Sequence, residues 1–145
     1  MRRAHDALTP DLFEVPVARD PKPGALAVGH PLRHLLSDLL KASTLSRFDI
    51  AARMSELTGQ EITKHQLDSW TAESRDGWRF PLEYLPAFEA AVQTHDVTVW
   101  LADLRGCRLL VGKDALEAEL GKLERARDEA GKRIRQLKQV MGEME

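Results

Sequence analysis

The chain has 145 residues, of which 43% are hydrophobic, 30% charged and 6% aromatic. This size and composition suit one compact helical domain with an appendage, and the apolar runs are far too short to span a membrane. The net charge is −2, and none of the segments 1–29, 30–80, 81–112 and 113–145 has a basic excess. A protein that binds DNA phosphates over a broad surface usually has one, so any DNA-binding face must come from the local placement of charge.

The first residues, MRRAHDALTPDLFE, lack the continuous apolar stretch of a secretory signal, so we expect a cytoplasmic protein without a membrane partner. Cys107 is the only cysteine, which excludes an internal disulfide and suits a reducing compartment. We expect its small side chain to be buried. The chain shows neither a nucleophile with a base to serve it nor a phosphate-binding loop, so we expect no catalytic activity and no cofactor.

Residues 1–29 hold several prolines and no sustained periodicity, which favours a flexible arm over a segment docked on the domain. A first helix is then predicted to begin near Pro31. A second opens with Ser46 and Asp49 as a cap and ends at Gly59. The expected inward residues of these two helices are Leu32, Leu35, Leu36, Leu39, Leu40, Ile50, Ala51, Met54 and Leu57.

A third, short helix opens with a capping box of Thr63 and Gln66. After a polar loop at residues 71–80, two further helices are predicted, one starting between Pro81 and Pro86 and one at 97–104. The expected inward residues of these three helices are Leu67, Trp70, Leu85, Phe88, Ala91, Val92, Trp100, Leu101 and Leu104.

The stretch FDIAARMSELTGQEITKHQLDSW, residues 48–70, has the pattern of a supporting helix, a turn and a recognition helix. In such a motif, outward side chains of the recognition helix reach base edges and flanking arginines hold phosphates. The candidate DNA-binding residues are Lys64, His65, Gln66, Asp68 and Ser69 on the third helix, with Arg47, Arg53, Arg75 and Arg79 around it. The spacing alone gives equal weight to a small helical domain whose polar face only meets water.

The same stretch, followed by FPLEYLPAFEAAV and VTVWLADLRGCRLL, resembles small phage regulators of the lambda-repressor, Cro and CII kind. In particular, it resembles the early regulatory proteins of Mu-like transposable phages, over roughly residues 30–112. The resemblance implies a helical DNA-binding domain with residues 64–69 on the recognition helix and with Leu67 and Trp70 holding that helix to the core. Ala51 and Leu67 are sixteen residues apart, farther than in the compact motif, which leaves open a repurposed fold that binds protein instead.

From residue 113 the pattern changes to a heptad repeat, with seam residues at alternating steps of four and three. The seam consists of Leu116, Leu120, Leu123, Arg127, Ala130, Ile134, Leu137, Met141 and Met144. A single helix would leave this stripe in water, so we expect a homodimer or higher oligomer in preference to a helix folded back on its own domain.

Charge along the seam favours antiparallel pairing. Parallel pairing would set Glu119 against Glu124 of the partner and would place two Arg127 side chains in one core layer. Antiparallel pairing instead brings Glu117 near Lys138 of the partner, which is an attractive contact.

Two other features are weaker. His30 and His34 are one helical turn apart, but two ligands make a poor metal site, so we expect solvent-facing or capping histidines and no metal. Trp70, Trp78 and Trp100 are expected in the core rather than as stacking platforms, with Trp78 the best candidate for ligand contact because Arg75 and Arg79 flank it.

The sequence therefore predicts an all-α protein with a flexible N-terminal arm (1–29), a helix-turn-helix domain of the lambda-repressor type (30–112) and a coiled-coil oligomerisation helix (113–145). The favoured function is a phage-type transcriptional regulator that binds double-stranded DNA as a dimer or higher oligomer. The alternatives are a non-catalytic adaptor that binds a host or phage protein, and an assembly scaffold in which the tail is the functional part.

Overall fold

The computed structural model describes residues 15–75 and 77–144, and the predictions for residues 1–14 lie outside this part of the chain. The described residues form helices joined by loops, without a strand, which confirms the all-α prediction. The chain divides into two units between Arg108 and Leu109. The described residues of the first unit are termed the head, and those of the second, Leu109 to Met144, the tail.

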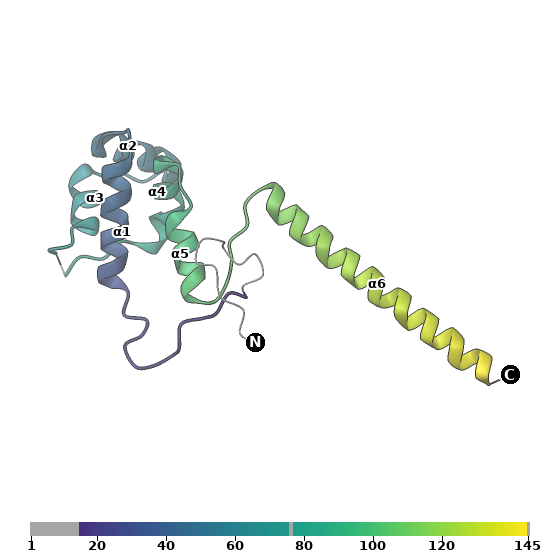
Figure 1. Ribbon diagram of the computed structural model, residues 1–145. Coiled ribbons are helices and arrows are strands. Elements are labelled where there is room, and N and C mark those ends of the chain that lie inside the picture. The colour runs from purple at the N-terminus through teal and green to yellow at the C-terminus, as the bar shows by residue number, and fades with distance from the viewer. Residues whose placement is uncertain (1–14, 76, 145) are drawn as a thin grey trace, which may run out of the picture. The chain divides into compact units, whose positions relative to one another are not determined.

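Helix α1 (Gly29–Ala42) carries the predicted leucine stripe (Figure 1). Leu36 and Leu40 are buried, and the other three leucines of the stripe pack against the core from its edge. Pro31 lies in the first turn, where its missing N–H costs no helical hydrogen bond.

Helix α2 (Arg47–Thr58) begins and ends as its sequence predicts. The Ser46 hydroxyl accepts a hydrogen bond from the backbone N–H of Asp49, and Gly59 ends the helix at φ 66°. Ile50, Ala51 and Met54 are buried. The expectation for Leu57 was wrong, because this residue borders a shallow groove on the outside of the head and is exposed.

Helix α3 (Lys64–Thr71) follows after the five-residue turn 59–63. Its predicted capping box is present: Gln66 N–H donates to Thr63 Oγ1 over 3.1 Å, and Thr63 N–H donates to Gln66 Oε1 over 2.9 Å. Leu67 and Trp70 are buried, so the helix packs on the core through the face that the sequence indicated.

A 3-10 turn (η1, Leu82–Tyr84) leads into α4 (Leu85–Val92), and α5 (Asp96–Leu104) follows. Phe88 and Val97 are fully buried. In contrast, Trp100 and Leu104 are only half-buried. The face of α5 that was expected to point inward is therefore only partly covered.

The core lies between α2 and α4, which pack most closely, and α1 crosses it to contact α3 and α5 (Figure 1). An aromatic group of Trp70, Phe80, Tyr84 and Phe88 joins α3 to α4, with ring centroids 5.5–5.9 Å apart. The third helix is therefore held against the rest of the head by large apolar side chains.

Part of the predicted arm is ordered on the head. Ala18 forms an antiparallel bridge with Arg105, and the N–H of Arg19 donates to the carbonyl of Leu104 over 3.0 Å. The sequence analysis favoured a flexible arm over a segment docked on the domain, whereas residues 18 and 19 do contact the domain. They do so because unpaired backbone groups at the end of α5 give the segment hydrogen-bond partners. Gly106 permits the approach: its φ is +68°, and a Cβ there would collide with the backbone nitrogen of Ala18.

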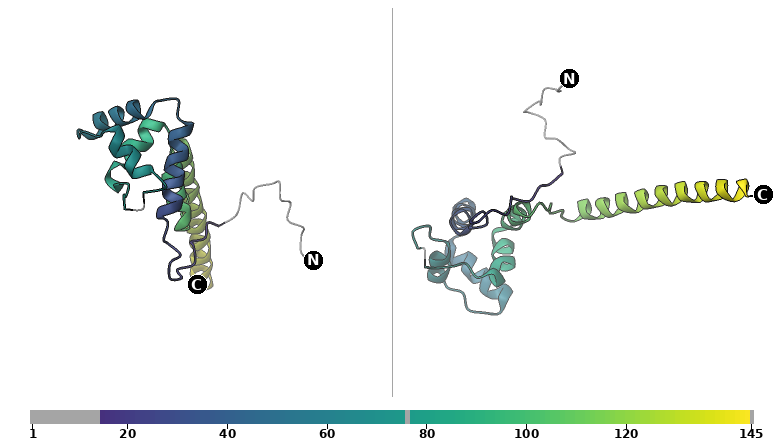
Figure 2. Two further views of the ribbon diagram at one scale, coloured as in Figure 1. Left: turned by 90° about the vertical axis from the view of Figure 1, so that its left-hand side faces the viewer. Right: turned by 90° about the horizontal axis from the view of Figure 1, so that it is seen from below.

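The tail is dominated by α6 (Lys113–Glu143), a 31-residue helix that Figure 1 and the right-hand view of Figure 2 show as unbroken. None of its described residues is buried within the chain. Gly121, Gly131 and Gly142 interrupt a composition that otherwise favours helix.

Candidate nucleic-acid interface

The predicted interface is the outer face of α3 with the arginines around it. Helix α3 has eight residues, and its second half is largely buried: Ser69, Trp70 and Thr71 are all in the core. The polar side chains of α3 that reach solvent are those of residues 64–66 and, in part, that of Asp68. A partner that reads α3 must therefore approach its N-terminal turn.

Ser69 does not face outward as predicted. It is 1% exposed, and its hydroxyl accepts a hydrogen bond from Arg75 Nη1 over 3.0 Å. The loop after α3 folds back and brings Arg75 over this side of the helix. Both groups thus have a structural role that the helical spacing alone did not reveal.

Asp68 joins the two candidate cations nearest to it. Lys64 Nζ lies 2.7 Å from Asp68 Oδ2, and Arg47 Nη1 lies 2.8 Å from Oδ1. Burial raises the pKa of Asp68, but hydrogen bonds from Lys64 and Arg47 and their positive charges outweigh it, so the pKa lies below its ordinary value. The three side chains form a half-buried cluster with a net charge of about +1.

Phe48 also belongs to this cluster, although the sequence analysis assigned no role to this residue. Its ring is 68% exposed, and Lys64 Nζ lies 5.3 Å from the ring centroid. A cation over an aromatic face is attracted by the ring quadrupole. Lys64 therefore lies between a carboxylate and a ring, with its side chain still partly exposed.

His65 and Gln66 are exposed at the start of α3, as predicted. The Gln66 side-chain oxygen already accepts from the Thr63 N–H, which leaves its amide nitrogen as the group available to a partner. His65 follows Lys64 of that cluster in the chain, and its side chain is exposed.

Arg53 is not brought to this face. It follows Phe48 by five residues, which places it about 140° farther around α2. There it borders a shallow cavity with Ala90 of α4 and Gln93 just after that helix, and its Nη1 pairs with Glu56 Oε2 at 2.7 Å. Its predicted DNA contact would need a surface separate from the outer face of α3.

Arg75 and Arg79 lie in the loop after α3, on either side of Trp78. The expectation that Trp78 belongs to the core was wrong, because its side chain is 49% exposed. Arg79 Nη1 donates to the Trp78 carbonyl over 3.4 Å. An exposed aromatic ring in a loop that also holds two arginines has the chemistry to contact a base or a peptide side chain.

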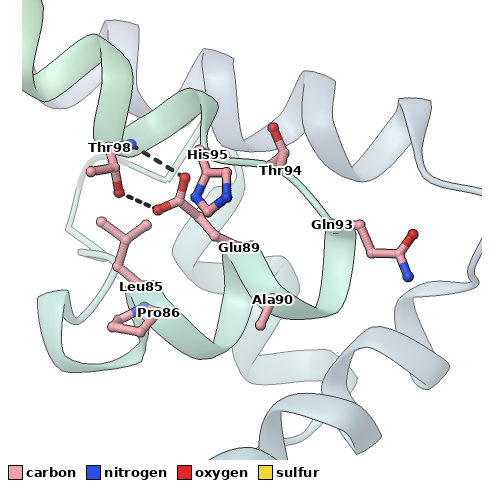
Figure 3. Close-up of a pocket in the computed structure, with 8 residues that line it drawn as sticks. All are labelled: Leu85, Pro86, Glu89, Ala90, Gln93, Thr94, His95 and Thr98. Carbon is pink, nitrogen blue, oxygen red and sulfur yellow. Dashed lines mark hydrogen bonds between the residues drawn. The ribbon is translucent and has the colours of Figure 1, made fainter. Parts of the chain in front are cut away.

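A cavity with a volume of about 560 Å³ lies between α4 and α5 (Figure 3). Glu89 on its wall is buried, and its carboxylate accepts from both the hydroxyl and the N–H of Thr98 in the first turn of α5. The carboxylate thus caps α5 from a neighbouring helix. The acidic side chain in this cavity therefore has hydrogen-bond partners within the protein and a structural role.

His34 joins α1 to the segment after α3. Its Nδ1 lies 2.7 Å from Glu73 Oε1, and its Nε2 lies 3.2 Å from Asp38 Oδ2. The hydrogen bond from His34 lowers the pKa of Glu73 from its ordinary value. Both ring nitrogens can donate at once only in the imidazolium form.

Among the residues that the structure describes, no group of three or more His, Cys, Asp or Glu side chains is arranged to hold a metal ion.

Cys107 is exposed, which contradicts the expected burial, because it lies where the chain leaves the end of α5.

Within residues 15–75 and 77–144, no helix has the length and apolar character needed to cross a membrane. Comparisons of the chain with protein-family models, with curated proteins and with solved structures found no match.

Proposed function

We propose that the protein is a phage-type regulator that binds double-stranded DNA through the N-terminal turn of α3 and self-associates through α6. The observation that carries this proposal is the α2–turn–α3 unit, with Lys64, His65 and Gln66 at the solvent side of a capped helix. The resemblance of residues 48–70 to small phage regulators supports it. We also propose that the protein acts in the cytoplasm and has no catalytic activity.

The charge arrangement sets the expected strength of binding. Arg47, Lys64 and Arg75 are the cations near α3, and Asp68 offsets one of them. Each phosphate contact adds about 0.9 to the slope of log affinity against log salt, so a head with two or three contacts has a shallow slope. Two heads joined through α6 would double the number of contacts, which explains why self-association belongs to the proposal.

The test is fluorescence anisotropy of the full chain with a labelled random-sequence duplex, followed by selection of tightly bound sequences. Lys64→Ala and Arg75→Ala should each weaken binding by about tenfold and reduce the salt slope by about 1. Lys22→Ala is the matched control, because it removes the same charge from the exposed segment before α1. Absence of binding by the full chain at low salt contradicts the proposal.

A second candidate function is a protein-binding adaptor, favoured by the cluster in which Asp68 neutralises Lys64 and Phe48 covers it. The exposed Phe48 ring suits a protein partner better than a phosphate backbone. Asp68→Asn separates the two functions. It removes a negative charge that repels phosphate, so a DNA-binding protein should bind duplex several-fold more tightly, whereas an adaptor should show no DNA binding before or after the change.

A further inference from the structure

The tail offers a second surface, whose occupant can be inferred in detail. We propose that two copies of α6 pair antiparallel in one register, with the two-fold axis between Asp128 and Glu129. This inference deepens the self-association in the proposed function, because it names the orientation, the core layers and the charge contacts of the dimer. It rests on α6 alone and does not depend on the nature of the head's ligand.

The seam of α6 is an apolar face in water. Leu116 is 72% exposed and Leu137 is 62% exposed, and every other large apolar seam residue is more than half exposed. Burying one leucine side chain contributes about 2 kcal/mol. A second copy of the same seam is the partner that fits, because it presents apolar residues at the same spacing over the full length of the helix.

The composition of the core layers decides the orientation. In the parallel arrangement each seam residue meets its own copy, so two Arg127 side chains share one layer in the middle of the helix. In the antiparallel register proposed here, Arg127 lies beside Ala130 of the other copy, whose small side chain leaves room for the guanidinium to reach solvent. The remaining layers are then Leu116 with Met141, Leu120 with Leu137, and Leu123 with Ile134.

The residues that flank the seam give the same result. Parallel pairing sets Glu119 against Glu124 of the other copy and sets Arg133 against Lys138, and all of these contacts are repulsive. Lys122 lies 3.5 Å from Glu119 in the same helix and offsets part of the first repulsion.

Antiparallel pairing removes both repulsions and places Glu117 near Lys138 of the other copy, twice in the symmetric dimer. Glu117 also lies 3.4 Å from Lys113 within its own helix. It therefore shares its charge between two lysines in the dimer.

The helix bounds support the register independently. The proposed axis between Asp128 and Glu129 falls next to Asp128, the middle residue of α6, which runs from Lys113 to Glu143. The register chosen from core layers and charges is thus also the one that overlaps the two helices over their whole length. At 1.5 Å per residue, it sets the two N-terminal ends of α6 about 45 Å apart.

Cysteine trapping tests the orientation in the full chain, with Cys107→Ser to remove the exposed native thiol. Leu120→Cys and Leu137→Cys are made separately in this background, one of them with an affinity tag. The antiparallel register predicts that a short bismaleimide links the two variants when they are mixed and links neither variant to itself. Efficient linkage within each variant alone would show parallel pairing and overturn the inference.

Charge reversal gives a second test that leaves the core intact. Glu117→Lys should weaken the dimer by about 3–10-fold, and the double change Glu117→Lys with Lys138→Glu should restore it. Glu124→Lys is the discriminating control. It lies near Gly131 in the antiparallel dimer and should change little, whereas in a parallel dimer it would meet Glu119 and tighten the pair.

The outcomes separate this inference from the proposed function. A mass of 16.3 kDa by light scattering at micromolar concentration, with no cross-linking, would refute the dimer whatever the head binds. A cross-linked antiparallel dimer that fails to bind duplex would leave the inference standing and refute DNA binding.

Discussion

Asp68 on α3 accepts a hydrogen bond from Arg47 in the first turn of α2, with 2.8 Å between Oδ1 and Nη1. This contact ties the first turn of α2 to the middle of α3, next to the candidate interface. A ligand that binds the N-terminal turn of α3 would therefore lie close to the Arg47–Asp68 pair.

Asp68→Ala should lower the free energy of unfolding by about 1 kcal/mol, because it removes a half-buried pair with two cations. Since the pKa of Asp68 is lowered in the folded protein, its contribution is present above the ordinary value of 3.8 and is lost as the pH falls through the lowered pKa. Urea unfolding near pH 7 and near pH 3 measures both effects. Glu61→Ala is the control, and an equal loss in this variant would contradict the assignment.

Glu73→Gln tests the link from α1 to the segment after α3. The pKa of Glu73 is lowered by its hydrogen bond from His34, so the carboxylate stabilises the fold above its ordinary pKa of 4.5. That contribution is lost as the pH falls through the lowered value. The melting temperatures of the parent and Glu73→Gln should therefore differ near pH 6 and converge at about pH 3. A difference that stays constant across this range would show that Glu73 acts through packing instead.

Gly106→Ala should destabilise the head by about 2–3 kcal/mol, because the new methyl group combines a left-handed backbone with a collision against Ala18. Gly24→Ala is the matched control: its φ is +79°, and no atom lies within 4 Å of the added Cβ. This control should lose only about 1 kcal/mol. Chemical unfolding measures both variants, and equal losses would mean that the contact between the N-terminal segment and the end of α5 adds no constraint.

Thr98→Val should cost about 2 kcal/mol or more, because it takes the hydroxyl donor from the buried carboxylate of Glu89 while keeping the shape of the side chain. Thr98→Ser keeps the donor and should lose less than half as much. The free energy of unfolding in urea separates the two variants. Similar losses would attribute the effect to packing of the methyl group.

The sequence predicted those parts of the fold that depend on neighbouring residues. The caps at Ser46 and Thr63 and the end of α2 at Gly59 each need only a side chain and a backbone group within three or four residues. Such local hydrogen bonds have a fixed spacing, so they can be read from the chain directly. The leucine stripe of α1 was predicted for the same reason.

Contacts between distant segments could not be predicted in this way. His34 meets Glu73 across thirty-nine residues, and Ser69 is buried because Arg75 folds back from the following loop. The pairing of Lys64 with Asp68 is an exception, since a cation and an acid four residues apart on a helix are expected to interact. The sequence analysis did not draw this pair from the spacing, although the pair partly neutralises the candidate interface.

The three glycines in α6 have a consequence for how the tail behaves on dilution. Each costs about 1 kcal/mol of helix stability relative to alanine, which is a large penalty for an isolated helix in water. If two copies of α6 pair as proposed, folding of the tail should be coupled to that pairing, and its circular dichroism at 222 nm should fall as the protein is diluted below the dissociation constant of the dimer. Abundance in the cell would then control whether the tail exists as helix or as coil.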